Sequence, residues 1–181
     1  AEIRGHFSLT EEGKQRLLEQ AKDEGIDGIL VTSTCNRTEI YSVGKKSSGN
    51  EVYQWLQTKG GLSDVEMDKH CYVHERDQAV NHLFRVAGGL ESLVLGESQI
   101  VGQLKDSWQM SISAGGIGKV LDRLFQHAFA TGKRIRSKTR IGDHPVSVAY
   151  TTVMLAKQIF GDATGESHNF LVGFSALFCD F

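Results

Sequence analysis

Proline is nearly absent from this sequence, since Pro145 is the single one among 181 residues. Proline interrupts helix interiors, so its absence from the preceding residues permits long helices there. The 20 glycines supply the breaks instead. Long apolar runs are lacking too, because none approaches the roughly 20 residues that a membrane-spanning helix needs. With 40% hydrophobic and 23% charged residues, the composition is typical of an ordinary globular protein.

Cysteine is also scarce, with three residues at positions 35, 71 and 179. An odd number of widely spaced cysteines argues against a disulfide framework and favours a reducing compartment. A free thiol survives there and can act as a nucleophile. The chain also has no strong excess of positive or negative charge, since its formal net charge is −2. Any site for a polyanion must therefore be a local patch.

The first part of the chain predicts mixed elements. A capping-box pattern at 8–11 precedes a helix that ends near Gly25, with Leu17, Leu18 and Ala21 facing inward. Residues 28–31 and 39–43 read as strands, 50–56 as a short helix and 70–74 as a further strand. We therefore expect an α+β fold, with a small ferredoxin-like subdomain and an antiparallel sheet over 1–76.

From residue 77 onward the pattern becomes helical. A helix beginning at Asp77 would place Val80, Leu83, Phe84 and Ala87 on one face. Further helices are expected at 97–113, 117–138 and 148–160, and Ala114-Gly115-Gly116 separates two of them. The sequence thus predicts a helical subdomain over 77–160, followed by a tail over 161–181.

Cys35 is the first candidate for chemistry, because it lies in the connection between the two predicted strands. Arg37 could stabilise a thiolate, and Thr34 and Asn36 could orient a substrate carbonyl. His82 lies on a mainly apolar helix face and could be the general acid or base for that thiol. For both residues the ordinary alternative is a structural side chain, since free cysteine is among the most buried residue types.

Three other stretches also carry polar groups. Residues 91–99 lead into a helix and either cap it or line a polar pocket. His70, Cys71 and His74 resemble a metal constellation only superficially, and strand alternation would turn Cys71 away, so a zinc site is not expected. The stretch GKRIRSKTR at 132–140 holds five cations, which either cap a solvated helix end or contact a phosphate backbone.

Three ordered motifs carry a resemblance to a known family. They are STCNRTEIY at 33–41, HLFRVAGGLESLVLGESQIVGQLK at 82–105, and GKRIRSKTRIG with VSVA at 132–149. Together they closely resemble glutamyl-tRNA reductase, over residues 3 to 162, in its N-terminal catalytic domain. That family reduces the glutamyl group of glutamyl-tRNA to glutamate-1-semialdehyde with NADPH, at the start of five-carbon tetrapyrrole (porphyrin) biosynthesis.

The resemblance implies a role for each matching residue. Cys35 matches the nucleophile that forms a thioester, and His82 matches a residue needed for full activity. The positions that match substrate contacts are Thr34, Asn36, Arg37, Ser92, Glu97, Ser98, Gln99 and Gln103. Our own inference adds a tRNA-facing group made of Lys133, Arg134, Arg136, Lys138 and Arg140. The implied partners are glutamyl-tRNA, a second copy in a homodimer, and glutamate-1-semialdehyde aminomutase, in the cytoplasm or the plastid stroma.

The chain also departs from the family pattern. We expect it to lack a first strand, the dimerisation domain and the NADPH-binding domain, of which 161–181 would be a linker or truncated start. No bound cofactor or metal is then expected, and the isolated chain would be limited to acyl transfer or slow ester hydrolysis. Two alternatives remain open: a non-catalytic RNA-binding α+β module with a structural Cys35, and a cysteine hydrolase or acyltransferase acting on small esters.

Overall fold

The computed structural model describes residues 9–23, 26–34, 37–44, 53–54, 57–58, 69–92, 95–96 and 99–142. The elements with bounds in this part are α2 (Glu11–Asp23), β1 (Gly28–Ser33), β2 (Thr38–Val43), α5 (Asp77–Ala87), α6 (Gln99–Ser113), α7 (Gly118–Lys138) and a 3-10 turn η1 (Arg140–Gly142). The two strands pair antiparallel, with Leu30 opposite Tyr41 and Thr32 opposite Glu39. The predicted α+β class with an antiparallel sheet is therefore confirmed.

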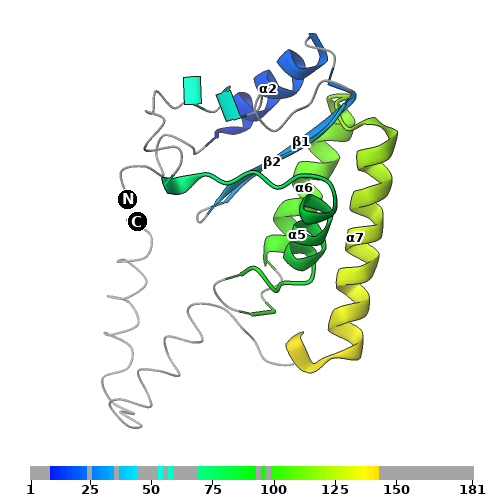
Figure 1. Ribbon diagram of the computed structural model, residues 1–181. Helices are drawn as coiled ribbons and strands as arrows, with labels where there is room; N and C mark the ends of the chain where they lie inside the picture. The colour runs from blue at the N-terminus through cyan, green and yellow to red at the C-terminus, as the bar shows by residue number, and fades with distance from the viewer. Residues whose placement is uncertain are drawn as a thin grey trace, which may run out of the picture.

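The hairpin lies between two helical layers (Figure 1). Helix α2 covers one face, and α5, α6 and α7 cover the other. Successive side chains of β1 alternate between the layers, as a strand requires. Ile29 and Val31 pack with α2, whereas Leu30 joins the core formed with the three later helices. Both faces of β1 are thus covered, which explains its continuous apolar run.

Helix α2 follows its prediction in length and inward face. Leu17, Leu18 and Ala21 are all buried against β1. The amide of Gly13 donates a hydrogen bond to Thr10 Oγ1 over 3.2 Å, so Thr10 caps the helix. The capping box predicted at 8–11 is therefore two residues too early.

The larger core is formed by β1, α5, α6 and α7, each of which contributes at least one fully buried side chain. Leu30, Leu83, Leu104 and Phe125 are each 0% exposed. Helices α5 and α7 approach closely beside this core, because a Cβ atom at Gly132 would lie 2.2 Å from the carbonyl oxygen of Ala87. Only a glycine at position 132 permits this close crossing, because any side chain would collide with that carbonyl oxygen. The crossing packs α5 directly against α7.

Two details of the predicted elements are corrected, one in the helical part and one in the α+β part. Val80 was expected on the buried face of α5 but is 38% exposed, while Val86 is buried in its place. The strand predicted at 70–74 is wrong, because 71–75 are irregular and the described sheet has two strands alone. A short alternating run becomes a strand only where a neighbouring strand accepts its hydrogen bonds.

Several predictions fall on residues outside the described part, namely the helix at 148–160, most of the helix at 50–56, and the tail. The division of the chain near residue 76 stays a prediction. No helix among the described ranges has the length and apolar character needed to cross a membrane.

Candidate active site

The strands are joined by a tight connection closed by Thr34 and Arg37. The Thr34 amide donates to the Arg37 carbonyl oxygen over 2.8 Å. The Arg37 amide donates in turn to Thr34 Oγ1 over 3.1 Å. Thr34 is therefore a turn-closing residue, which is a frequent use of a short hydroxyl side chain. Cys35 and Asn36, which connect the two in sequence, lie outside the described residues.

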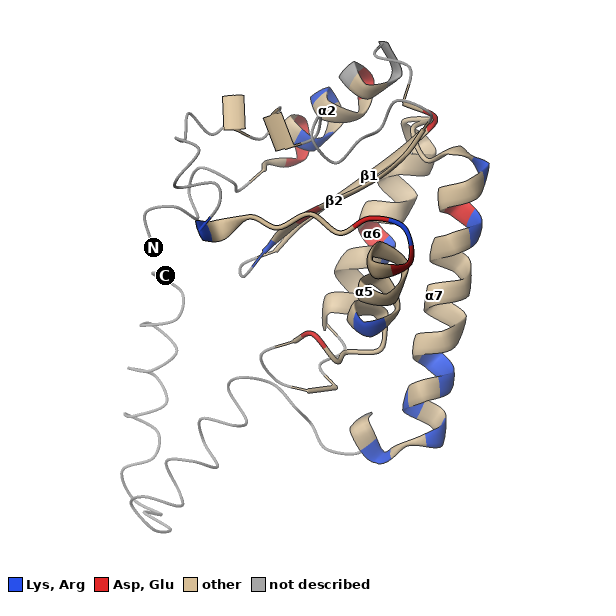
Figure 2. Ribbon diagram, viewed as in Figure 1, with Lys and Arg blue, Asp and Glu red and all other residues tan. Residues whose placement is uncertain are grey.

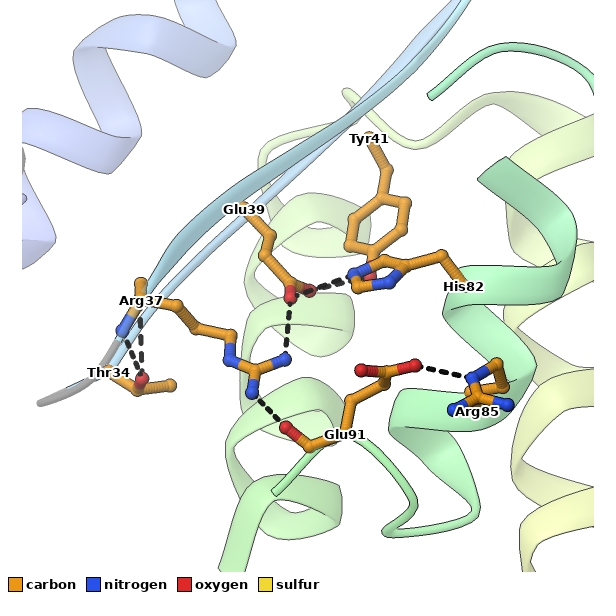
Figure 3. A network of polar contacts seen from close by, with 7 residues as sticks. All are labelled: Thr34, Arg37, Glu39, Tyr41, His82, Arg85 and Glu91. Carbon is orange, nitrogen blue, oxygen red and sulfur yellow. Dashed lines mark hydrogen bonds and ion pairs between the residues drawn. The ribbon is translucent and has the colours of Figure 1, made fainter. Parts of the chain in front are cut away.

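A buried carboxylate, Glu39, gathers three side chains from two elements (Figure 3). Its Oε1 accepts from Arg37 Nη1 and from His82 Nε2, each over 3.1 Å. Its Oε2 accepts from the Tyr41 hydroxyl over 2.6 Å. The Glu39 side chain is only 9% exposed, and that of His82 is 13% exposed. The hairpin and α5 are thus joined at this carboxylate.

Burial and hydrogen bonding act in opposite directions on the pKa of Glu39. Burial raises it, but hydrogen bonds from His82, Tyr41 and Arg37 favour the charged form and together bring the pKa below its ordinary value of 4.5. Burial and the neighbouring Glu39 charge raise the pKa of Tyr41 well above 10.0. Glu39 is consequently a carboxylate and Tyr41 a phenol at neutral pH.

An ionised carboxylate can only accept hydrogen bonds, and this determines which ring nitrogen of His82 donates to Glu39. The hydrogen bonded to Glu39 must lie on Nε2 of the imidazole. In the neutral ring, Nδ1 then carries the lone pair and is the nitrogen able to take up a proton. His82 therefore has the arrangement of a general base oriented by a carboxylate.

The loop after α5 contributes a second set of contacts. Arg37 Nη2 donates to the carbonyl oxygen of Glu91, and the Glu91 carboxylate pairs with Arg85. The Arg85 hydrogen bond holds the pKa of Glu91 below its ordinary value. The Gly96 amide donates to the Gly89 carbonyl oxygen over 2.9 Å, which draws the ends of this loop together. The guanidinium of Arg37 thereby connects the hairpin to the loop that contains Ser92.

A surface cavity of about 510 Å³, largely open to solvent, lies beside His82. It is lined by side chains of α5 and of the segments before and after it, namely His74, Asp77, Gln78, Asn81, His82, Arg85 and Glu91. The exposed ring of Tyr72 lies next to it, with its centroid 6.0 Å from that of His82. His82 is therefore shared between the buried network on one side and this cavity on the other.

The remaining predicted site residues are distributed as follows. Ser92 is half-buried directly after Glu91, while Gln99 is exposed at the start of α6 and Gln103 is half-buried one turn later. Glu97 and Ser98 lie outside the described part. The basic residues predicted at 133–140 gather at the end of α7 and in η1 (Figure 2). Within the described ranges, no three His, Cys, Asp or Glu side chains are placed to hold a metal ion.

The sequence of this chain was compared with those of known protein families. Residues 1–139 match the family described as glutamyl-tRNAGlu reductase, N-terminal domain. The chain belongs to the glutamyl-tRNA reductase family. A glutamyl-tRNA reductase of Halorhodospira halophila is 44% identical over 161 residues, which are 88% of this chain and 36% of that protein. One from Christiangramia forsetii is 45% identical over 174 residues, 96% of this chain and 41% of the relative.

The fold agrees with this assignment. The structure of glutamyl-tRNA reductase from Methanopyrus kandleri superposes with a TM-score of 0.68 at 29% identity, covering 87% of this chain and 37% of that one. The chain therefore spans about two fifths or less of the length of these relatives. Within the family, this chain corresponds to the N-terminal domain, and the matched residues include the STCNRTEIY motif.

Sequence reasoning missed Glu39, the residue on which the described part of the site converges. A signal was present, because Glu39, Tyr41 and Val43 share one face of an alternating strand. A carboxylate on the same face as two apolar residues must be buried and must find partners there. Tyr72 and His74 were missed as cavity neighbours because the segment was predicted to be a strand.

Proposed function

We propose that this chain performs the acyl-transfer step in the NADPH-dependent reduction of glutamyl-tRNA to glutamate-1-semialdehyde. The observation that carries the proposal is the convergence of Arg37 and His82 on Glu39, beside the connection in which Cys35 stands. Family membership and the residues of the STCNRTE motif support it. The cytoplasm, or the plastid stroma in a plant or alga, keeps Cys35 in its thiol form.

The proposed step converts an ester into a thioester. The Cys35 thiolate attacks the glutamyl carbonyl carbon, a C–S bond forms, and the C–O bond to the terminal ribose breaks. His82 takes the thiol proton at Nδ1 and returns it to the departing ribose oxygen, while Glu39 holds the Nε2–H. A thioester carbonyl is more electrophilic than an ester carbonyl, which prepares it for reduction.

Recognition of the glutamyl group is assigned to the residues around this centre. The N–H groups of Arg37 that do not bond Glu39 or Glu91 bind the substrate side-chain carboxylate. Glu97 pairs with the substrate amine. The other proposed contacts are Thr34, Asn36, Ser92, Ser98, Gln99 and Gln103.

NADPH supplies a hydride in the complete reaction when it is bound. In the described part of this chain, neither strand leads into a glycine-rich turn and a helix, which is the arrangement that holds a dinucleotide. The described residues do not fit this cofactor, and no step is assigned to them through it. Homodimerisation and handover to glutamate-1-semialdehyde aminomutase are likewise proposed for the longer protein.

Mixing this chain with glutamyl-tRNA and quenching in acid is expected to add one glutamyl group to Cys35, measured by intact mass. The Cys35→Ser variant should show no acid-stable thioester, and Cys71→Ser should be acylated like the wild type. Cys71 is a suitable control because it is a half-buried cysteine that is not part of a disulfide and lies outside the motif. Acylation of Cys35→Ser at the wild-type rate would refute the proposed nucleophile.

We also propose that the basic end of α7 contacts the tRNA backbone. Lys133, Arg134, Lys138 and Arg140 are exposed and can reach a phosphate group, whereas Arg136 is half-buried and one of its guanidinium nitrogens is fully buried. The start of the same helix mixes both signs of charge (Figure 2), since its first residues include Lys119, Asp122 and Arg123. The net positive field therefore lies at one end of α7.

Replacing Lys133 and Arg134 together by glutamine is expected to weaken tRNA binding. The slope of log affinity against log salt should fall by about one for each phosphate group that the variant no longer neutralises. The matched double variant Lys119→Gln/Arg123→Gln removes the same charge from the other end of α7 and should bind tRNA as the wild type does. Equal effects of the two double variants, measured by filter binding between two salt concentrations, would contradict the proposal.

A further inference from the structure

We propose that the cavity beside His82 binds the 3′-terminal adenosine of glutamyl-tRNA, with the adenine base stacked on Tyr72. This inference rests on the proposed function, in which His82 protonates the departing ribose oxygen. Every tRNA carries its amino acid on the ribose of a terminal adenosine. The ribose must therefore lie within hydrogen-bond reach of His82 during the reaction.

The position of the cavity determines where the nucleoside goes. One edge of the His82 ring is engaged by Glu39 in the buried network, and the ring also lines the cavity. A ribose hydrogen-bonded to His82 consequently extends its base away from the hairpin and into this cavity. Its volume of about 510 Å³ lies in the range of 300–1,000 Å³ usual for sites of small ligands, and because the cavity is largely open, a bound base would keep part of its surface in solvent.

Three aromatic rings stand together at this cavity. The centroids of Tyr72 and His74 are 5.0 Å apart, and those of His74 and His82 are 5.2 Å apart. Tyr72 is 65% exposed, so a large ring face is available to solvent. Exposed aromatic rings are the usual platforms on which proteins stack unpaired bases. The Tyr72 ring is thus placed to receive a base whose ribose is at His82.

The polar lining favours a neutral nucleoside over a phosphate group. Arg85 is already paired with Glu91, which leaves Asp77 as the lining charge without an ion pair among the described residues. An acidic wall repels phosphate, whereas ribose hydroxyls can donate to a carboxylate. Gln78 and Asn81 offer amide groups that both donate and accept, as the adenine edge requires.

The test is a titration of the 15N-labelled chain with adenosine, followed by amide chemical shifts. Adenosine is expected to shift the signals of Gln78, Asn81 and His82 in the wild type. Tyr72→Ala should weaken this binding by roughly 10-fold, the order of effect seen when a stacking ring is removed. Tyr72→Phe keeps the ring and should bind within about twofold of the wild type. Val120→Ala, at an exposed α7 position outside the lining, should change nothing.

Two results would overturn the inference: adenosine shifts none of these signals, or Tyr72→Ala binds it as well as Tyr72→Phe does. A second readout separates this failure from failure of the proposed function. Cys35 acylation is measured with glutamyl-tRNA and with glutamate ethyl ester, which lacks the nucleoside. Tyr72→Ala should slow the first and not the second. Absence of acylation by either donor, with adenosine still bound at Tyr72, would refute the acyl-transfer proposal while leaving the nucleoside site established.

Discussion

Replacing Glu39 by glutamine is expected to slow the acylation of Cys35 by glutamyl-tRNA about 100-fold, the order of loss that follows a small misplacement of reacting groups. An uncharged amide accepts hydrogen bonds from Arg37 and His82 less strongly than a carboxylate does. If its NH₂ group faces one of these two residues, two donors meet and that hydrogen bond is lost. The imidazole then loses the partner that holds the proton on Nε2. Acylation is measured by quenched intact mass over time.

The same substitution should also lower the free energy of unfolding, by about 1.5–3 kcal/mol at pH 7, the range for a hydrogen bond to a charged group. The folded-state pKa of Glu39 lies below 4.5, so its charge contributes stability fully above that value. The contribution is lost as pH falls through the folded-state pKa. The difference between wild type and Glu39→Gln, measured by urea unfolding, should therefore be largest at neutral pH and should shrink below pH 4.5.

Glu19→Gln provides the matched control, because it makes the same chemical change on the exposed surface of α2, away from the helix ends. It should alter neither acylation nor stability beyond about 0.5 kcal/mol. Tyr41→Phe removes one of the three donors to Glu39 and should have a smaller effect than Glu39→Gln on both measurements. A Glu39→Gln protein that is acylated as fast as the wild type would show that the carboxylate does not position His82.

Replacing Gly96 by alanine is expected to destabilise the fold by about 2–5 kcal/mol, combining the cost of a left-handed backbone with that of overpacking. Gly96 has a φ of +85°, and a Cβ atom there would lie 1.9 Å from the carbonyl oxygen of Ile141. The atom in conflict with the new Cβ is a backbone oxygen, which cannot rotate away as the end of a flexible side chain can. The loop would have to move, and its Glu91 carbonyl would leave Arg37. Thermal unfolding and Cys35 acylation should therefore decline together.

Gly102 is the matched glycine, since a Cβ atom there would meet nothing within 4 Å beyond the backbone of its own helix. It lies in α6 on an exposed face, so Gly102→Ala should stabilise the protein by about 0.5–1 kcal/mol through better helix propensity. Thermal unfolding of Gly96→Ala and Gly102→Ala compares the same substitution at a left-handed loop residue and at a helical residue. Equal melting temperatures would show that Gly96 is not a constrained position.

Much of the local structure was predictable because its causes are local. The apolar spacing of Leu17, Leu18 and Ala21 predicted α2 and its buried face, and the glycines at 115–116 predicted the break between α6 and α7. The segment at 71–75 was not predictable in this way. Its alternation matched a strand, but strand formation depends on a partner elsewhere in the chain.

The sequence by itself determined α2, the two strands, α5, α6 and α7, together with the α+β class and the family, through patterns whose residues are adjacent or one helical turn apart. It also identified Arg37 and His82 as candidate site residues, but it did not show that the two side chains lie close together. Only the tertiary structure decided that they share the buried carboxylate of Glu39, 43 residues before His82 in the chain. The physical reason is that the charge on a buried group depends on every neighbour the fold brings to it, and those neighbours come from elements whose packing no local pattern specifies.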